Sequence, residues 1–164
     1  MMLSKFYSAG LLALALLFAA PAVSRAQTAK YKCMVQMTSY MGEEAYVVIS
    51  LINPKGGYEK TLYVLGSDKK WYNTLKDWFA FYKQKRTDIS AITGASVAGG
   101  DRSVNVIELE NSKINAGYKI RFEAAVEDKK YNVKDIEIPL TTESLSAKTE
   151  GAGGYIRYVR FSPN

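Results

Sequence analysis

The sequence contains no histidine and only one cysteine, and these two shortages remove several kinds of functional site. Without histidine the chain cannot build a Ser-His-Asp or Cys-His catalytic arrangement, or a zinc site with imidazole ligands. One cysteine excludes a four-cysteine zinc site and an internal disulfide. Cys33 stands in an alternating apolar run, so we expect a small buried side chain rather than a reactive thiol. Stability must therefore come from packing alone.

Acidic residues are also poorly placed for catalysis. Glu43 and Glu44 are adjacent in a polar stretch, and Asp88 follows a basic one. Neighbouring carboxylates in a loop are usually solvated, and they offer no acid and base held at a fixed distance. The alternating acids of a calcium loop do not occur. We therefore expect a non-enzymatic protein without a metal site.

The chain lacks an apolar run of the ~20 residues that a membrane span requires. Its N-terminus instead has the pattern of a signal peptide, with Lys5, the apolar run GLLALALLFAA at 10–20, and small residues on either side of Arg25. Cleavage after residue 26 would leave Gln27 first, and Cys33 lies too far inside for a lipoprotein. We expect a soluble periplasmic or secreted product with no membrane insertion after cleavage.

Positive charge is in modest excess and is dispersed. Residues 1–26 carry Lys5, Arg25 and no acid, so the mature chain keeps 20 basic residues against 16 acidic ones, a net charge of +4. The longest basic block is KQKR at 83–86. Such a surface is typical of an ordinary solvated face, and we expect no nucleic-acid partner.

Most of the mature chain has the character of short β-strands. The segment 46–52 is a nearly continuous, β-branched apolar run, which is typical of a central strand buried on both faces. The segment 118–127 alternates most clearly and predicts a polar face that includes Arg121 and Glu123. The predicted strands cover residues 30–38, 46–52, 59–65, 104–109, 118–127, 132–140 and 155–161, and the Gly-rich segment 141–154 is predicted to be a loop.

One segment, 71–82, has helical periodicity instead. Trp71, Leu75, Trp78, Phe79 and Tyr82 fall on one face of an amphipathic helix. Ser67 or Asp68 is the expected N-cap, and Trp71, Leu75 and Trp78 should be buried against a sheet. We predict a single domain, residues 27–164, that folds as an antiparallel Ig-like β-sandwich with one inserted helix.

The chain also contains 12 tyrosines, which can either pack against the core or line a binding surface. We expect Tyr46, Tyr63 and Tyr118 to pack against the core, because they lie on predicted strands. The sequence leaves open whether Tyr40, Tyr131 and Tyr155, which lie near turns, line a binding surface.

The order of several weak motifs resembles a known family. A leader is followed by YVVISLINPKGGYEKTLYVLG, then KKWYNTLKDWFAFY, then ITGAS, then GYKIRFEAAVED. This order is similar to that of the bacterial predicted periplasmic proteins called domain-of-unknown-function family 2271. The last motif departs from the family pattern, since Gly117 is followed directly by Tyr118. The resemblance covers roughly residues 30–127.

What the resemblance implies is an accessory role. Members of this family are often encoded near flavin-attachment, iron-uptake or membrane redox components. The resemblance therefore implies an exported binding module in a periplasmic flavin-dependent redox or iron-acquisition system, with an unidentified periplasmic or membrane redox or uptake protein as its partner.

The ITGAS segment also resembles the pattern Asp-x-x-Ser/Thr-Gly-Ala-Thr/Ser, in which FMN is attached through a phosphoester to the last hydroxyl. That hydroxyl is Ser96, and Thr93 begins the motif. Ser90 stands where the pattern has its acid, and Asp88 lies two residues earlier. If FMN were attached, Trp78 or Tyr82 would be the aromatic residues to stack on it. Otherwise Thr93 and Ser96 would shape a tight turn by bonding local backbone.

These observations support three hypotheses about the function of the protein. The first is a non-enzymatic exported binding module without a resident cofactor. The second is an electron carrier with FMN attached covalently at Ser96. The third is a structural Ig-like interaction domain.

Overall fold

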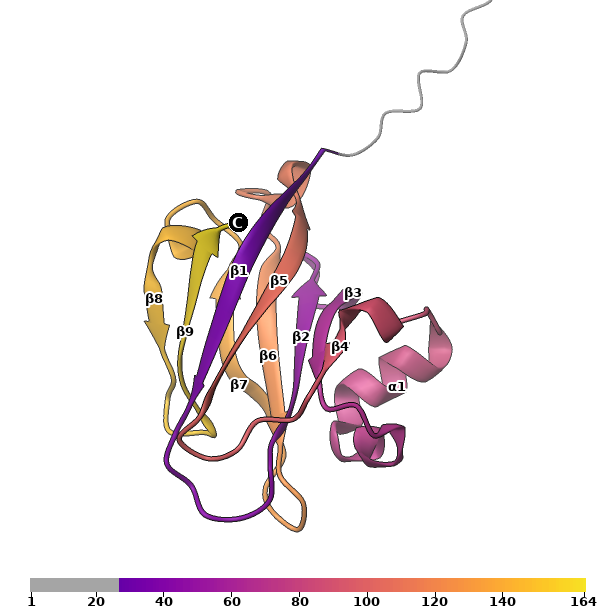
Figure 1. Ribbon diagram of the computed structural model, residues 1–164. Helices are drawn as coiled ribbons and strands as arrows, with labels where there is room; N and C mark the ends of the chain where they lie inside the picture. Colours follow the sequence, from indigo (N-terminus) through magenta and orange to yellow (C-terminus); the bar gives the residue numbers. More distant parts are fainter. Residues whose placement is uncertain (1–26) are drawn as a thin grey trace, which may run out of the picture.

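The computed structural model describes residues 27–164, which fold as two stacked β-sheets with one α-helix on the outside (Figure 1). The four-stranded sheet has the order β5 (Arg102–Glu110), β1 (Thr28–Met37), β9 (Ile156–Pro163) and β8 (Lys148–Glu150). The five-stranded sheet has the order β4 (Thr93–Gly94), β3 (Tyr58–Leu65), β2 (Tyr46–Ile52), β6 (Lys119–Ala125) and β7 (Asn132–Pro139). Neighbouring strands are antiparallel except β3 and β4, which are parallel. The predicted sandwich is confirmed.

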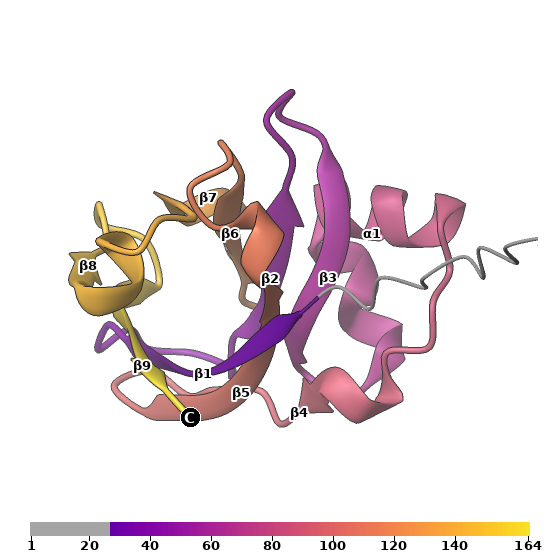
Figure 2. The same ribbon diagram turned by 90° about the horizontal axis from the view of Figure 1, so that it is seen from above.

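The helical elements are short. The 3₁₀ segments are η1 (Lys69–Thr74), η2 (Ser90–Ile92), η3 (Asn111–Lys113) and η4 (Ser144–Ser146), and the α-helix α1 is Lys76–Gln84. Seen from above, α1 lies against β3 on the side of the five-stranded sheet that faces away from β1 and β9 (Figure 2). The molecule therefore has three layers, namely sheet, sheet and helix.

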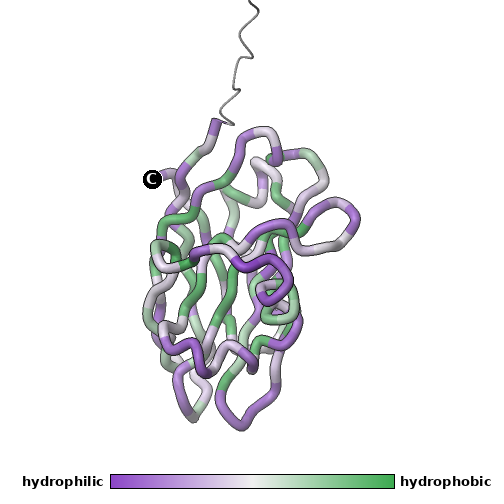
Figure 3. The backbone as a smooth tube through the Cα atoms, turned by 90° about the vertical axis from the view of Figure 1, so that its right-hand side faces the viewer, coloured by the Kyte–Doolittle hydropathy of each residue, from purple (hydrophilic) through white to green (hydrophobic). Residues whose placement is uncertain are grey.

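Two apolar clusters hold these layers together. The larger one fills the space between the sheets and includes Cys33, Ile49 and Phe122. The smaller one lies between the five-stranded sheet and the helix, with Val48, Leu75 and Trp78 at its centre. Figure 3 shows the corresponding pattern, in which hydrophobic segments follow the strands and hydrophilic ones form the turns. Cys33 is fully buried as predicted, and burial raises the pKa of its thiol.

Strand β2 belongs to both clusters. Its residues Val47, Ile49 and Leu51 face the other sheet, whereas Val48 faces the helix. This explains why the segment reads as continuous apolar sequence instead of alternating. The predicted central strand is confirmed.

The structure corrects two of the predicted boundaries. The segment 141–154, predicted to be a loop, contains η4 and the edge strand β8, which pairs with β9. The beginning of ITGAS, also predicted to be a turn, forms β4 beside β3. Both strands are too short, at 3 and 2 residues, to produce an alternating pattern in the sequence.

The predicted helix is broken in the middle. Leu75, at φ −86° and ψ 66°, ends the 3₁₀ segment η1 and precedes α1. Asp68 caps η1 by accepting a hydrogen bond from the Lys70 N–H, which confirms one of the two expected caps. Leu75 and Trp78 are fully buried as predicted, but Trp71 lies on η1 and is only half-buried.

The outer face of β6 departs most from prediction. Its alternation predicts solvent-exposed Arg121 and Glu123, yet both side chains are buried. Arg121 Nε lies 2.7 Å from Glu137 Oε2 on β7, and Glu123 is covered by the helical layer. The alternation of one strand cannot show that a distant segment folds over its polar face.

The predicted signal peptide, residues 1–26, lies outside the described residues. Within residues 27–164, no helix has the length and apolar character needed to cross a membrane.

Candidate functional site

Ser96 is held in place by the strands around it. A two-residue bridge joins Ala45 to Val97, with N–H to carbonyl distances of 2.8 and 3.1 Å in the two directions. Directly before it, β4 is fixed to the end of β3, where the Gly66 N–H donates to the Gly94 carbonyl at 2.8 Å. These two attachments bring the end of ITGAS beside the start of β2, although about 50 residues separate them along the chain.

The Ser96 hydroxyl donates a hydrogen bond to a carboxylate oxygen of Glu44. Ser96 is half-buried and Glu44 is exposed, so the pair lies at the rim of the molecule. Ser96 therefore does not bond local backbone, as a simple turn residue would. A carboxylate at this position orients the serine oxygen and is placed to take up its proton.

A cavity of about 190 Å³ opens beside this pair. Its other walls come from three parts of the chain, namely the start of β2, the segment η1 and the end of β6. The cavity is smaller than a complete small-molecule pocket, so it would hold part of a ligand and leave the remainder in solvent. The lining residues are Glu43, Glu44, Tyr46, Trp71, Thr74, Ser96, Ala125 and Glu127.

Two aromatic side chains stand in these walls. The Tyr46 ring lies against Gly66, where a β-carbon would come within 2.1 Å of the ring, so only glycine leaves it room. The ammonium group of Lys70 lies over the Trp71 ring, 5.2 Å from the centre of the ring. Both rings are half-buried and present apolar surface to the cavity. Flat aromatic ligands bind to surfaces of this kind by stacking.

Thr93 is not part of the cavity lining. Its hydroxyl donates to the Ile89 carbonyl at 2.8 Å, which is the local backbone role considered for it. The structure therefore separates the two residues of the motif, since Ser96 reaches the cavity and Thr93 secures the preceding turn.

Trp78 and Tyr82 are also absent from the lining, contrary to the expected stacking role. The Trp78 indole is fully buried, and its Nε1–H donates to Thr61 Oγ1 at 2.9 Å. The two rings stack on each other at 5.1 Å under the helix. Helical periodicity places Trp71, Trp78 and Tyr82 on one face of a helix. It cannot show that the helix is broken at Leu75, or that of these three residues only Trp71 lines the cavity.

The acid that the flavin-attachment pattern requires is missing from position 90, but a carboxylate lies next to it. Asp88 accepts hydrogen bonds from the Ser90 hydroxyl at 2.6 Å and from the Ser90 N–H at 2.9 Å. These bonds lower the pKa of the Asp88 carboxyl, which is exposed. The local structure thus supplies an acid beside the position at which the pattern has one.

The cavity has an acidic rim, formed by the exposed Glu43, Glu44 and Glu127. Within residues 27–164, no three acidic or thiol groups are close enough together to hold a metal ion. The negative charge of these carboxylates attracts cationic groups and disfavours anionic ones.

The three tyrosines near turns lie outside this cavity, and each makes contacts that hold the fold together. The Tyr131 hydroxyl donates to Glu123, and the Tyr155 hydroxyl donates to the Lys130 carbonyl at 2.7 Å. The Tyr40 and Tyr155 rings meet edge to face at 5.2 Å. Tyr46, Tyr63 and Tyr118 pack against the apolar clusters as predicted, but Tyr46 also lines the cavity. This second role could not be predicted from the sequence, because the other walls of the cavity come from distant segments.

Comparison with known proteins gives a family but no described relative. No curated protein and no solved structure matches the chain. The model of a family described as "Predicted periplasmic protein (DUF2271)" matches residues 28–158, which include every strand of both sheets except the end of β9. Since this match covers most of the chain, the protein belongs to the DUF2271 family of predicted periplasmic proteins.

Proposed function

We propose that this protein is an exported, non-enzymatic carrier module of an extracytoplasmic redox system, and that it holds FMN at the cavity beside Ser96. The observation that supports this most is the position of the Ser96 hydroxyl at a cavity walled by Tyr46 and Trp71. A serine that accepts a flavin needs an accessible oxygen, and the flavin ring needs an aromatic surface beside it. The ITGAS segment supplies the first and η1 with β2 supplies the second.

The attachment reaction would be a transfer from FAD, catalysed by a separate flavin transferase. The Ser96 oxygen attacks the phosphorus of the FMN half, the pyrophosphate bond of FAD breaks, and AMP leaves. The serine proton passes to Glu44 or to water. The product is a phosphoester that fixes the flavin while the protein surrounds part of its ring.

The acidic rim has a consequence for this carrier. Three glutamates beside the ring disfavour added negative charge, so they lower the reduction potential of a bound flavin. A low potential suits a carrier that receives electrons from one membrane component and passes them to another. An unidentified periplasmic or membrane redox protein is the partner that this function requires.

The test is the intact mass of the protein after co-expression with a periplasmic flavin transferase and a flavin supply. We expect an added mass equal to FMN less one water, together with flavin absorbance. Ser96→Ala should remove both, and Ser67→Ala, which removes an exposed hydroxyl outside the motif and the cavity, should retain them. Ser90→Asp, which restores the acid of the pattern, should raise the modified fraction. An unmodified mass for both the parent and Ser90→Asp would contradict covalent attachment.

The acidic rim favours a second candidate, an accessory binding module without covalent flavin in a redox or iron-acquisition system. Negative groups at the cavity repel a phosphate, and they suit a neutral or cationic partner group. Titration of the unmodified protein with riboflavin and with FMN, followed by Trp71 fluorescence, separates the two. Under this candidate riboflavin binds more tightly than FMN, and Trp71→Phe removes the signal.

A further inference from the structure

Strand β5 is a long edge strand with apolar side chains exposed to solvent. It spans 9 residues and pairs on one side only, with β1, in an unbroken register from Arg102 to Glu110. Val104 is 55% exposed and Val106 is 42% exposed, and in the part of the chain that the structure describes only Met41 joins them as an exposed large apolar side chain. An edge of this kind is a template for pairing with another strand.

Strand β5 has only some of the usual protections of an edge strand, namely the charged side chains of Arg102, Glu108 and Glu110. Its sequence, RSVNVIELE, contains no proline and no lysine, and its pairing with β1 has no bulge. The other long edge, β7, ends at Pro139 and carries Lys134. The contrast indicates that the β5 edge is not shielded in the same way.

The outward-facing residues of β5 are self-complementary. Since alternate residues of a strand share a face, Arg102, Val104, Val106 and Glu108 form one row, and all four are exposed. Read in order, the row is positive, apolar, apolar and negative. When two such rows run antiparallel about Asn105, each Arg102 lies opposite a Glu108, and each Val104 lies opposite a Val106.

We propose that β5 pairs with β5 of a second copy of this chain, antiparallel and about a two-fold axis at Asn105, so that the two four-stranded sheets form one continuous sheet. The interface is isologous, because each contact occurs twice with the copies exchanged. It pairs opposite charges and apolar side chains directly across the strands, which are the pairs that stabilise a sheet. A shift of one residue would place the charged row of one copy against the inward-facing row of the other.

A groove lies beside β5, and its far wall is formed by β3 and η2 of the same chain. This groove, of about 300 Å³, lies between Val106 and Glu108 on one side and Leu62, Ala91 and Ile92 on the other. It is on the side of β5 that faces away from β1, where the second copy would approach. In the proposed register the second copy's Val104 lies opposite Val106, which lines this groove.

Sedimentation equilibrium of the protein of residues 27–164 tests the proposal by measuring its molar mass. Protein concentrations from ~10 µM to ~1 mM are needed, because this range detects weak dimers. We expect a monomer–dimer equilibrium for the parent protein. Arg102→Glu and Glu108→Arg should each weaken the dimer by about tenfold or more, because each places two like charges opposite each other. The double variant should restore the affinity of the parent, since it recreates both pairs in reverse.

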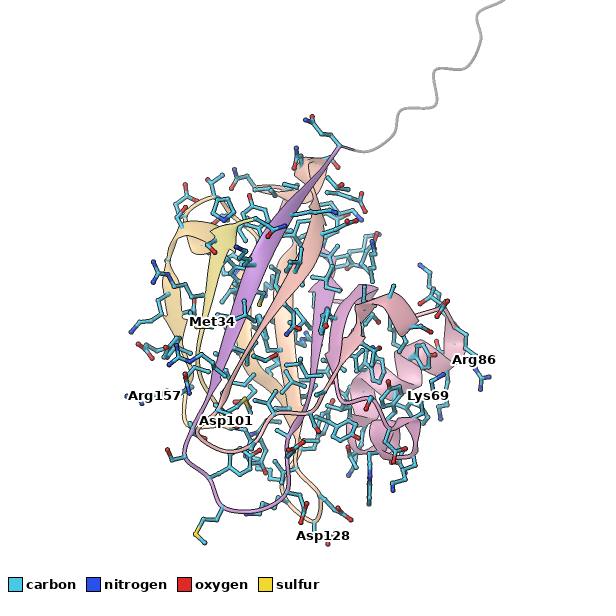
Figure 4. The ribbon with its side chains drawn as sticks, viewed as in Figure 1. Met34, Lys69, Arg86, Asp101, Asp128 and Arg157 are labelled. Atoms are coloured by element: carbon cyan, nitrogen blue, oxygen red, sulfur yellow. The ribbon has the colours of Figure 1, made fainter. Side chains whose placement is uncertain are left out.

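Arg157→Glu is the control, because it makes the same charge change at an exposed site on β9, two strands from the edge (Figure 4). It should leave the dimer unchanged. All substituted side chains are exposed, so the variants should fold, and their urea midpoints check this. A parent protein that stays monomeric throughout would overturn the proposal. A double variant no better than the single ones would overturn the register.

Discussion

At the scale of single residues, the most unusual group is Glu123, an acid with no exposed surface. Its carboxylate accepts hydrogen bonds from the hydroxyls of Tyr58 and Tyr131 and from the Trp78 N–H. It thus joins β3, the residue that precedes β7, and the helix at one point. A buried carboxylate persists only where such donors replace the water it has lost.

We expect Glu123→Ala to lower the free energy of unfolding by about 2–4 kcal/mol, because the buried Trp78 N–H and two partly buried tyrosine hydroxyls lose their acceptor. Urea unfolding measures this value. The control is Glu127→Ala, which removes an exposed carboxylate just beyond the same strand and should cost at most about 0.5 kcal/mol. Equal midpoints for the two variants would show that Glu123 has no structural role.

The pH dependence of stability gives an independent test of the same group. Burial raises the pKa of Glu123, while its hydrogen bonds and the nearby Arg121 act in the opposite direction. Because the folded state then holds the proton more tightly than the unfolded state, this group destabilises the fold as pH rises above the ordinary glutamate pKa of about 4.3. The contribution becomes constant once the pH has passed the raised folded pKa.

Glu123→Gln lacks this titration. We therefore expect the free energy of unfolding of the parent protein, relative to Glu123→Gln, to be highest at acidic pH and to fall as the pH rises toward neutral. Urea unfolding of both proteins across this range measures the difference. A difference that grows with pH would mean that the pKa of Glu123 is lowered instead.

At the scale of elements, helix α1 depends on the sheet for its N-terminal cap. Leu75, its own N-cap residue, makes no side-chain hydrogen bond. The first turn is satisfied from the sheet instead, since the Asp77 N–H donates to the Tyr131 hydroxyl at 3.1 Å and the Trp78 N–H donates to Glu123 at 3.3 Å. The negative carboxylate also lies at the favourable end of the helix dipole.

Tyr131→Phe should therefore cost about 1–2 kcal/mol and should accelerate amide exchange at Asp77 and Trp78, because an acceptor at the helix start is lost. Hydrogen exchange measured by NMR resolves these amides. Tyr158→Phe, at a half-buried tyrosine outside this cluster, is the control and should change neither quantity. Unchanged exchange at both amides of Tyr131→Phe would refute the capping role.

The two tryptophans should behave differently, although the sequence places them on one helical face. Trp78→Ala should cost about 3–5 kcal/mol, because a fully buried ring leaves a cavity under the helix. Trp71→Ala should cost clearly less, because its ring is half-buried at the rim, and it should impair flavin binding instead. Thermal unfolding of the two variants gives the comparison, and similar losses would contradict the division of roles.

The sequence predicts elements well where the periodicity reports burial directly. The apolar run of β2 and the hairpin that follows it are found within one residue of their predicted ends. It fails where a distant segment changes the environment, as with Arg121, which pairs with Glu137 on β7, and Glu123, which the helical layer covers. For the candidate site the motif identifies Ser96, but Tyr46 and Glu44 join it only through the bridge between Ala45 and Val97. Such contacts leave no periodic signal in the chain.

At the scale of the whole molecule, the two outer faces of the sandwich differ. One is covered by η1 and α1, of which η1 also forms a wall of the cavity, while the four-stranded sheet ends in the unpaired edge of β5. The cavity and the groove beside β5 share no lining residue, although Ile92 of the groove belongs to the same ITGAS segment as Ser96. We expect a dimer formed through β5 to leave Ser96 accessible to a transferase and to a redox partner. The dimer variants should accordingly accept flavin as well as the parent protein does.

The central claim is that the cavity beside Ser96 holds FMN, and peptide mapping of protein purified from its native host tests it most directly. Trypsin cuts after Arg86 and Arg102, which releases a peptide of residues 87–102 that contains Ser90, Thr93 and Ser96. We predict that this peptide carries the mass of FMN less one water and that fragmentation assigns it to Ser96. Recovery of the peptide without added mass, from cells that contain an active periplasmic flavin transferase, would contradict the claim.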